Sequence, residues 1–107
     1  METRLAALLQ ELRSALEALY GDRLVHVILY GSQARGEATA DSDIDVMVVL
    51  KGTVDLPGRE IDRMMPVLEQ LWNCYTELVT IVPISERDYQ NRKSPLLLTV
   101  RAEGVPV

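Results

Sequence analysis

Residues 29–50 read LYGSQARGEATADSDIDVMVVL, and the rest of the chain can be interpreted by working outward from them. An apolar run that ends at Tyr30 enters a turn bounded by Gly31 and Gly36, and a second apolar run leaves that turn at Ile44. Short apolar runs bounded by turn residues are typical of strands. We therefore predict a strand, a turn and a second strand that begins with two carboxylates.

Those two carboxylates, Asp43 and Asp45, flank Ile44. Because side chains alternate across a strand, they would project from one face, about 6.6 Å apart along the backbone. Neighbouring carboxylates destabilise each other's charge unless a cation or solvent compensates, so the pair indicates a site for a divalent cation. The alternative is that residues 41–43 are an ordinary turn and that Asp45 is a solvated strand residue.

The turn before the aspartates favours the cation site. Gly31 permits a backbone geometry that other residues resist and lets N–H groups approach an anion closely, and Ser32 adds a hydroxyl. A phosphate-binding turn and a cation pair on adjacent strands would converge on one nucleoside triphosphate. The turn lacks the Gly-Lys-Ser/Thr of a P-loop, and its glycines do not form the dinucleotide-binding Gly-x-Gly-x-x-Gly.

The order Gly31-Ser32, ten further residues and DIDV at residues 43–46 resembles the signature of the DNA polymerase β-like nucleotidyltransferase superfamily. The fuller string, with ARG at residues 34–36 and DSD at residues 41–43, is similar to the minimal nucleotidyltransferase branch. The resemblance implies an α/β (α+β) fold, with a small mixed sheet of three or more strands packed by helices as in the polymerase β-like palm. It also implies that residues 1–107 form a single minimal nucleotidyltransferase domain.

The resemblance assigns a role to each part of the site. Asp43 and Asp45 would be the shared metal ligands and catalytic carboxylates. Oxygen-only ligands indicate Mg²⁺, or Mn²⁺ in its place, with ATP as the substrate. Gly31 and Ser32 would hold the β and γ phosphates.

Two further positions are less determined by the residues themselves. Arg35 would bind nucleotide phosphates and act as a secondary charge stabiliser, but without the family pattern it could equally be a surface residue paired with Glu37 or Asp41. Families of this type usually carry a third carboxylate on a later strand, where this chain has Thr80. Glu77 is the nearest acid, but in a regular strand it points from the opposite face, so it is an uncertain third carboxylate.

Composition restricts the classes of function. A chain of 107 residues with 48% hydrophobic residues suits one compact domain. Its net charge of −5 argues against a polynucleotide as the main ligand. The single cysteine, Cys74, cannot form an internal disulfide and is expected to be a small core residue rather than a reactive thiol. With no signal peptide or long apolar span, we expect a cytoplasmic protein that does not contact membranes.

The spacing of apolar residues predicts one helix and two strands in the first half of the chain. Leucines at helical intervals indicate an amphipathic helix over residues 3–20 that packs on a sheet or, alternatively, binds a partner. Residues 24–30 are the expected first strand. Residues 43–50 are apolar on both faces after Asp45, which is typical of a central strand covered on both sides.

The middle of the chain predicts a second helix. We expect a loop over residues 55–58 and then an apolar stripe from Ile61 to Trp72 at helical spacing. Pro66 lies inside this stripe and predicts a kink or a break. Trp72 is expected to pack in the core rather than to stack on an adenine.

The last third predicts a strand and two helical segments. The strand over residues 78–84 contains Pro83, which indicates an edge strand or a strand that is ending. Ser85 and Ser94 are expected to cap the two helical segments, the second of which ends at Gly104. That last helix is apolar over much of its surface, so it either completes the core or forms a docking surface.

The family resemblance also implies a partner. Because the chain shows no acceptor-binding domain, the acceptor is expected on another chain. The minimal branch resembles the nucleotidyltransferase of two-gene toxin-antitoxin systems whose partner is a HEPN protein. In that setting the chain would be an antitoxin that transfers AMP from ATP to a tyrosine of the HEPN toxin.

Other functions stay open from the sequence. The chain could be a nucleotide-binding and partner-binding module, weakly active or inactive, that neutralises a HEPN protein by masking it. Thr80 and the apolar last helix favour this alternative. Transfer to a small molecule such as an aminoglycoside is a third hypothesis, and association into a homo-oligomer is also left open.

Overall fold

The computed structural model describes residues 2–39 and 42–107 and is built around a four-stranded sheet. The strand order is β3-β2-β1-β4. β1 is antiparallel to β2 and to β4, and β2 is parallel to β3, so the predicted small mixed sheet is confirmed. The strands are β1 (Leu24–Tyr30), β2 (Ile44–Leu50), β3 (Val79–Ser85) and β4 (Val105–Pro106).

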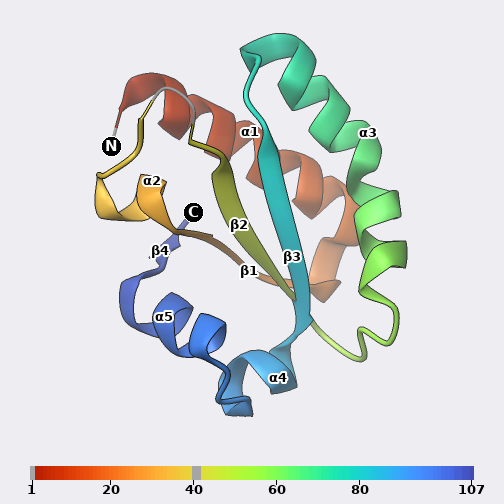
Figure 1. Ribbon diagram of the computed structural model, residues 1–107. Coiled ribbons are helices and arrows are strands. Elements are labelled where there is room, and N and C mark those ends of the chain that lie inside the picture. The colour runs from red at the N-terminus through yellow and green to blue at the C-terminus, as the bar shows by residue number, and fades with distance from the viewer. Residues whose placement is uncertain (1, 40–41) are drawn as a thin grey trace.

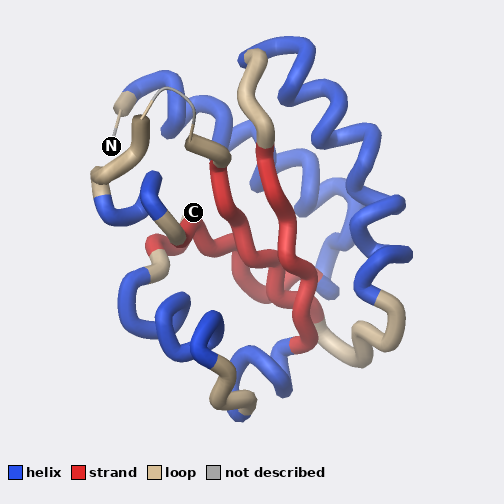
Figure 2. Tube along the Cα trace, in the orientation of Figure 1, coloured by secondary structure: helices blue, strands red, loops and turns tan. Residues whose placement is uncertain are grey.

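Helices surround the sheet on both faces, as Figure 2 shows in blue around the red strands. None of the helices in the described part of the chain is long and apolar enough to cross a membrane. The helical elements are α1 (Thr3–Tyr20), η1 (Gly21–Arg23), α2 (Ser32–Arg35), α3 (Pro57–Tyr75), α4 (Glu86–Asn91) and α5 (Pro95–Glu103).

The two long helices, α1 and α3, cover one face of the sheet (Figure 1). Apolar residues of α1 recur every three or four positions and form one stripe against the strands, which confirms the helix predicted over residues 3–20. The buried residues of this core are Leu5, Leu8, Leu9, Leu12, Leu16, Tyr20, Val27, Leu29, Ile44, Val46, Val48, Leu50, Met64, Leu71, Val79 and Ile81.

The shorter helices α4 and α5 pack near the opposite face, and both begin at the predicted serines. Ser85 Oγ accepts the N–H of Asp88 at 3.1 Å, and Ser94 Oγ accepts the N–H of Leu97 at 3.2 Å. Each bond satisfies an amide that has no partner within its own helix. The buried residues of this second core are Ile28, Met47, Val49, Ile84, Leu97 and Val100.

β2 lies between β1 and β3 and is covered on both faces, as its composition predicts. Every residue of β2 is buried except Asp45, which is partly buried. β3 is an edge strand, which agrees with the presence of Pro83. Asp45 is therefore held by a buried interior strand of the sheet, beside an edge strand.

Helix α3 corrects two expectations about the middle of the chain. It begins at Pro57, within the predicted loop over residues 55–58, because proline is tolerated in the first turn of a helix. Of the kink or break predicted at Pro66, the break is wrong, since α3 continues through that residue. Pro66 is exposed, so water can bind the carbonyl that its missing N–H leaves free.

Trp72 and Cys74 were expected in the core, and both expectations are wrong. The Trp72 side chain is 51% exposed, and Cys74 is exposed as well. The turn of α3 that carries them meets the sheet through Leu71, which is buried, so these neighbours face outward.

A buried carboxylate ties the N-terminal end of α3 to residues of α1 and η1. Glu60 is 5% exposed, and its carboxylate lies 2.7 Å from Arg23 Nη1. It also accepts a hydrogen bond from the Tyr20 hydroxyl at 3.4 Å. Burial, and after it the Glu60 charge, raises the pKa of Tyr20 to about 12. A buried carboxylate is tolerated here because charged and polar groups compensate it.

Candidate active site

The glycine turn leads directly from β1 into the short helix α2. Gly31 has φ 76° and ψ −156°, a conformation that residues with a side chain rarely adopt. Its carbonyl accepts the N–H of Arg35 at 3.2 Å, and the carbonyl of Ser32 accepts the N–H of Glu37 at 3.0 Å. Gly36 ends the helix in the left-handed region with φ 72°. The two glycines therefore bound the turn for conformational reasons.

Gly31 and Asp45 are packed against each other where β1 and β2 meet. A β-carbon on residue 31 would lie 2.5 Å from Oδ2 of Asp45, far inside van der Waals contact. The residue before the turn, Tyr30, is the pairing partner of Asp45 across the antiparallel strands. The structure thus brings two of the predicted site residues together, and the φ of 76° with the close approach of Asp45 favours glycine at residue 31.

Asp43 lies just before β2, which begins one residue later than predicted, and it is exposed. Burial, and after it the nearby Asp43 charge, raises the pKa of Asp45. The Asp43 charge is therefore close enough to act on the Asp45 carboxylate. Asp41, the first residue of the DSD string, lies outside the described residues.

Tyr30, Asp45 and Thr80 form a row across three neighbouring strands. Asp45 pairs with Tyr30 on one side and with Thr80 on the other. Residues of paired strands at one level share a face, so the Thr80 side chain lies next to that of Asp45. Burial, and after it the charge of Asp45, raises the pKa of Tyr30. The sequence analysis did not include Tyr30 in the site, although its place directly before Gly31 was a signal.

Arg35 is held by two glutamates. Its Nε lies 3.1 Å from Glu37 Oε2, and its Nη1 lies 3.6 Å from Glu103 Oε2. The hydrogen bond that the Arg35 guanidinium donates to the Glu37 carboxylate is the main cause that raises the pKa of Arg35. The pairing with Glu37 matches the alternative considered from the sequence, whereas the other partner considered there, Asp41, is outside the described residues. Arg35 would have to exchange these partners to reach a phosphate.

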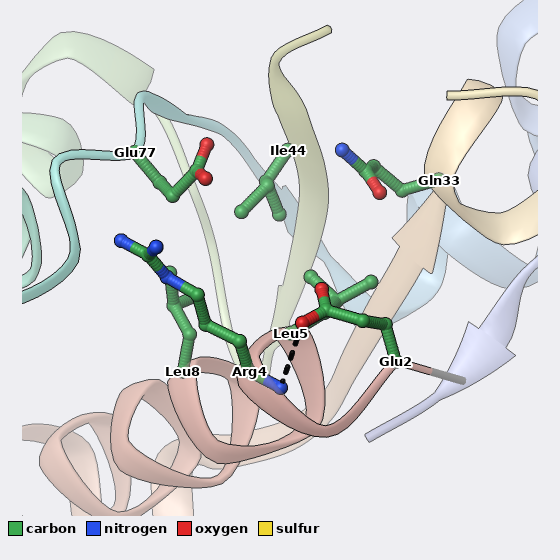
Figure 3. A pocket seen from close by; sticks show the side chains of 7 residues that line it. All are labelled: Glu2, Arg4, Leu5, Leu8, Gln33, Ile44 and Glu77. Atoms are coloured by element: carbon green, nitrogen blue, oxygen red, sulfur yellow. Dashed lines mark hydrogen bonds between the residues drawn. The ribbon is translucent and has the colours of Figure 1, made fainter. Parts of the chain in front are cut away.

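Glu77 is placed away from Asp45. It lines a small cavity of about 30 Å³ together with Arg4 and Ile44, and Figure 3 shows the Glu77 and Arg4 side chains directed toward the same space. Ile44 belongs to the core under α1, whereas Asp45 projects from the opposite face of β2. The structure therefore does not bring Glu77 to Asp45.

The donor set fits one hard cation. Asp43 and Asp45 offer carboxylate oxygens, the ligands that Mg²⁺ and Mn²⁺ prefer. Within residues 2–39 and 42–107, no group of three or more His, Cys, Asp and Glu residues is arranged to hold a metal ion. Thr80 supplies a hydroxyl where a third carboxylate would complete a second metal site.

Comparison with protein families explains this arrangement. The model of the nucleotidyltransferase domain family matches residues 9–97, which include both strands and the turn of the site. The chain belongs to this nucleotidyltransferase family. The recognition made from the glycine turn and the paired aspartates is confirmed.

The nucleotidyltransferase domain is similar to curated proteins of Methanocaldococcus jannaschii that are named as candidate protein adenylyltransferases. One is 42% identical over 62 residues, which cover 58% of this chain and 40% of the relative. Another is 45% identical over 47 residues, which cover 44% of this chain and 45% of the relative. The matches thus span less than half of the length of each relative.

Solved structures share the fold at low identity. A toxin-antitoxin crystal structure with AMP-PNP superposes with a TM-score of 0.61 at 20% identity, over 91% of this chain and 70% of that chain. The toxin-antitoxin MntA-HpeT superposes with a TM-score of 0.58 at 17% identity, over 94% and 69%. A candidate nucleotidyltransferase of Sulfolobus solfataricus has a TM-score of 0.52 at 20% identity, over 99% and 86%. These likenesses confirm the nucleotidyltransferase fold.

Proposed function

We propose that the chain is a Mg²⁺-dependent nucleotidyltransferase that transfers AMP from ATP to a tyrosine of a partner protein. The observation that carries this proposal is the contact between Gly31 and Asp45, where a β-carbon on residue 31 would lie 2.5 Å from the Asp45 carboxylate. A turn that can bind phosphates and a carboxylate that can hold a cation are therefore built as one site. Only a ligand that carries both phosphate and metal uses the two features together.

Each residue of the site has a role in this reaction. Asp43 and Asp45 would hold Mg²⁺ or Mn²⁺, which when bound neutralises triphosphate charge and orients the α-phosphoryl group. Gly31 and Ser32 would bind the β and γ phosphates. The tyrosine oxygen forms a bond to the α-phosphorus, the bond from that phosphorus to the α–β bridging oxygen breaks, and pyrophosphate leaves with the bridging oxygen. The phenolic proton passes to water.

The proposed partner is a HEPN-domain toxin encoded by a neighbouring gene, with this chain as its antitoxin. The names of the relatives support protein adenylylation, and the fold is shared with toxin-antitoxin assemblies. The net charge of −5 also suits a small nucleotide substrate better than a polynucleotide.

Labelled ATP tests this proposal directly. The purified chain is incubated with Mg²⁺, α-labelled ATP and the neighbouring protein, and the label on that protein is measured. We expect labelling that Asp45→Asn reduces by at least about a hundredfold, because a shared ligand is lost. Asp62→Asn, which changes an exposed aspartate of α3, is the control and should label at the wild-type rate. Equal labelling by Asp45→Asn would contradict the proposal.

A masking module is the second candidate, and the hydroxyl of Thr80 at the third position favours it. Here the chain would neutralise its partner by covering it, without group transfer. Asp43→Asn combined with Asp45→Asn would then leave neutralisation intact, whereas Leu98→Glu on α5 would abolish it. Leu98 is suitable for this test because it is 52% exposed, whereas Leu97 is buried and its replacement would disturb folding.

A further inference from the structure

A hollow beside the edge strand β3 opens on the sheet face from which Asp45 projects. Side chains of a strand alternate between its faces, so Met47 projects from β2 on the same face as Asp45. On β3, Val82 shares this face with Thr80. Met47 and Val82 pair with each other one row beyond Asp45 and Thr80, and both belong to the second core. Both also line a hollow of about 570 Å³, which we call the β3–α5 hollow.

The β3–α5 hollow has an apolar floor and is bordered by the short helices. It lies at the end of the sheet where β3 leads into α4 (Figure 1). Met47 is 0% exposed and Leu97 is 2% exposed, whereas Leu96 at the start of α5 is 41% exposed. The hollow also continues past the edge of β3 to the start of α3, where Pro57 lines it. A volume of this size accommodates one or two large side chains of another molecule.

The order of the strands places the glycine turn and β3 on opposite sides of Asp45. The order is β3-β2-β1, and Gly31 directly follows β1, so Asp45 on β2 lies between the turn and β3. In phosphoryl transfer, the attacking and leaving oxygens lie roughly in line through the phosphorus. If the turn holds the leaving pyrophosphate, the attacking hydroxyl must enter over β3. The nucleoside is bonded to the same phosphorus but off this line, so it does not occupy that path.

The β3–α5 hollow lies next to this path of entry. Thr80 pairs with Asp45 on the β3 side and is exposed. Val82 projects from the same face two residues later, about 7 Å along the strand. A segment whose hydroxyl reaches Asp45 over Thr80 can therefore place a neighbouring side chain in the hollow.

The charge and polarity of the lining restrict the occupant. The lining contains one acid, Asp88, and one base, Arg92, so its charges are balanced. An apolar floor without net charge suits an uncharged aliphatic or aromatic side chain, because a charge placed there would lose its hydration. A second copy of this chain would bring a net charge of −5 to a molecule of the same charge. A partner of opposite charge is therefore favoured over self-association.

We propose that the β3–α5 hollow receives an aliphatic or aromatic side chain of the acceptor protein, close in space to the tyrosine that accepts AMP. The acceptor protein would enter over β3 and would carry a positive net charge. This inference rests on the proposed function, because it names the acceptor surface of the same site.

Two leucines of α5 with similar exposure test the hollow. Leu96 lines it and is 41% exposed, whereas Leu98 does not line it and is 52% exposed. Binding of the neighbouring protein is measured by calorimetry, and its labelling is measured by kinetics. Leu96→Glu should raise the Kd and the KM for that protein by about tenfold or more with kcat nearly unchanged. Leu98→Glu should leave these values within about twofold, and neither change should alter the affinity for ATP.

Further changes at residue 96 separate an apolar anchor from an attraction between charges. Leu96→Lys should weaken binding of the neighbouring protein as Leu96→Glu does, because either charge loses water when the hollow is filled. Leu96→Met keeps the size and the apolar character of the side chain and should bind like the wild type. Binding that Leu96→Glu strengthens and Leu96→Lys weakens would overturn the apolar anchor. Glutamate is compatible with folding here, because Leu96 lies in the first turn of α5.

The outcomes distinguish the hollow from the activity. If wild type transfers no AMP but Leu96→Glu still loses binding of the neighbouring protein, the proposed function fails and the docking surface stands. If Leu96→Glu and Leu96→Lys bind and label that protein like wild type, the hollow is not the docking surface although the activity stands. A lower affinity for ATP in both variants, with an unchanged KM for the protein, would instead assign the hollow to the nucleoside. The proposal is also overturned if wild type does not bind the protein, or if sedimentation shows a wild-type dimer that Leu96→Glu converts to monomer.

Discussion

At the scale of single residues, the site depends on the contact between a backbone and a carboxylate. Gly31 adopts φ 76° at the place where Asp45 Oδ2 approaches it. Backbone strain and steric exclusion therefore act on the same position. Any side chain at residue 31 must displace the Asp45 carboxylate, so the proposed cation binding would change together with stability there.

Replacement of this glycine tests that coupling. Gly31→Ala should lower the free energy of unfolding by about 1–3 kcal/mol, because alanine is strained at this φ and ψ. It should also weaken ATP binding in Mg²⁺, since the added methyl group pushes the Asp45 carboxylate aside. Calorimetry and urea unfolding measure the two effects, with Gly58→Ala as the control because a β-carbon there meets open space. An unchanged ATP affinity would contradict the coupling.

The ionised side chain of Asp45 should lower the free energy of unfolding when no metal is bound. Burial and the charge of Asp43 raise the pKa of Asp45 above its ordinary value of 3.8. Between the ordinary and the raised pKa, the folded state binds more protons than the unfolded state, so stability falls as pH rises through that window. At neutral pH in EDTA, Asp45→Asn should therefore unfold at a higher temperature than wild type.

Two conditions check the cause of this effect. Below pH 3.8 the advantage of Asp45→Asn should vanish, because the wild-type carboxyl is then protonated in both states. Mn²⁺ should raise the Tm of wild type more than that of the variant, since the cation binds the ionised pair. Asp45→Asn with a Tm below that of wild type in EDTA at pH 7 would refute the prediction.

At the scale of elements, α3 shows how tertiary packing overrides a local signal. Pro66 removes a hydrogen bond from the helix interior, yet α3 runs unbroken on both sides of it. Met64 and Leu71 are buried on the face that meets the core, and Pro66 lies on the exposed face. Packing of the buried face holds the helix together across the missing bond.

Restoring the missing donor should stabilise α3. Pro66→Ala should raise the free energy of unfolding by about 1–3 kcal/mol, because it supplies the N–H and removes the ring from the helix interior. Pro95→Ala is the matched control, since proline at the first position of α5 costs no intrahelical bond. Thermal and urea unfolding of both variants measure the difference. Equal effects of the two substitutions would contradict this explanation.

At the scale of the whole molecule, strand register assembles the site from distant parts of the chain. Asp45 lies between Tyr30 and Thr80 only because β2 pairs with β1 and β3 in one particular alignment. A slip of one residue would turn these side chains to the opposite face. The position of the Thr80 side chain next to Asp45 is therefore set by the pairing of the strands and not by β3 alone.

A third carboxylate placed in this row should change metal binding. Thr80→Asp should lower the free energy of unfolding in EDTA by up to about 1 kcal/mol, because it adds a like charge beside Asp45. It should also bind more Mn²⁺ per chain than wild type in the presence of a non-hydrolysable ATP analogue. Thr80→Asn is the uncharged control. Equal Mn²⁺ stoichiometry in Thr80→Asp and wild type would show that residue 80 does not face the metal site.

Much of the fold could be predicted because its signals are local. The leucine spacing of α1, the serine caps of α4 and α5 and the apolar run of β2 each lie within one short segment. The same holds for the core of the site, since Gly31 and the paired aspartates belong to one turn and the strand after it. Caps, turns and alternation act between near neighbours, so a sequence reveals them without knowledge of the fold.

The remaining features depend on contacts between distant segments. The spacing of apolar residues predicts that Trp72 lies in the core. It is exposed because α3 packs on the sheet through another face of the helix. The short strand β4 follows Gly104, where the last helix was expected to end, and was not predicted; it forms because Val105 pairs with Leu29.

The sequence by itself determined the long helices, the three longer strands, the nucleotidyltransferase motif and the choice of Gly31, Asp43 and Asp45. The tertiary structure alone decided that Arg35 pairs with Glu103, that Glu77 faces Arg4 and that Thr80 stands beside Asp45. The physical reason is that helix faces and strand register are selected by the burial of apolar surface over the whole sheet, which no single segment encodes.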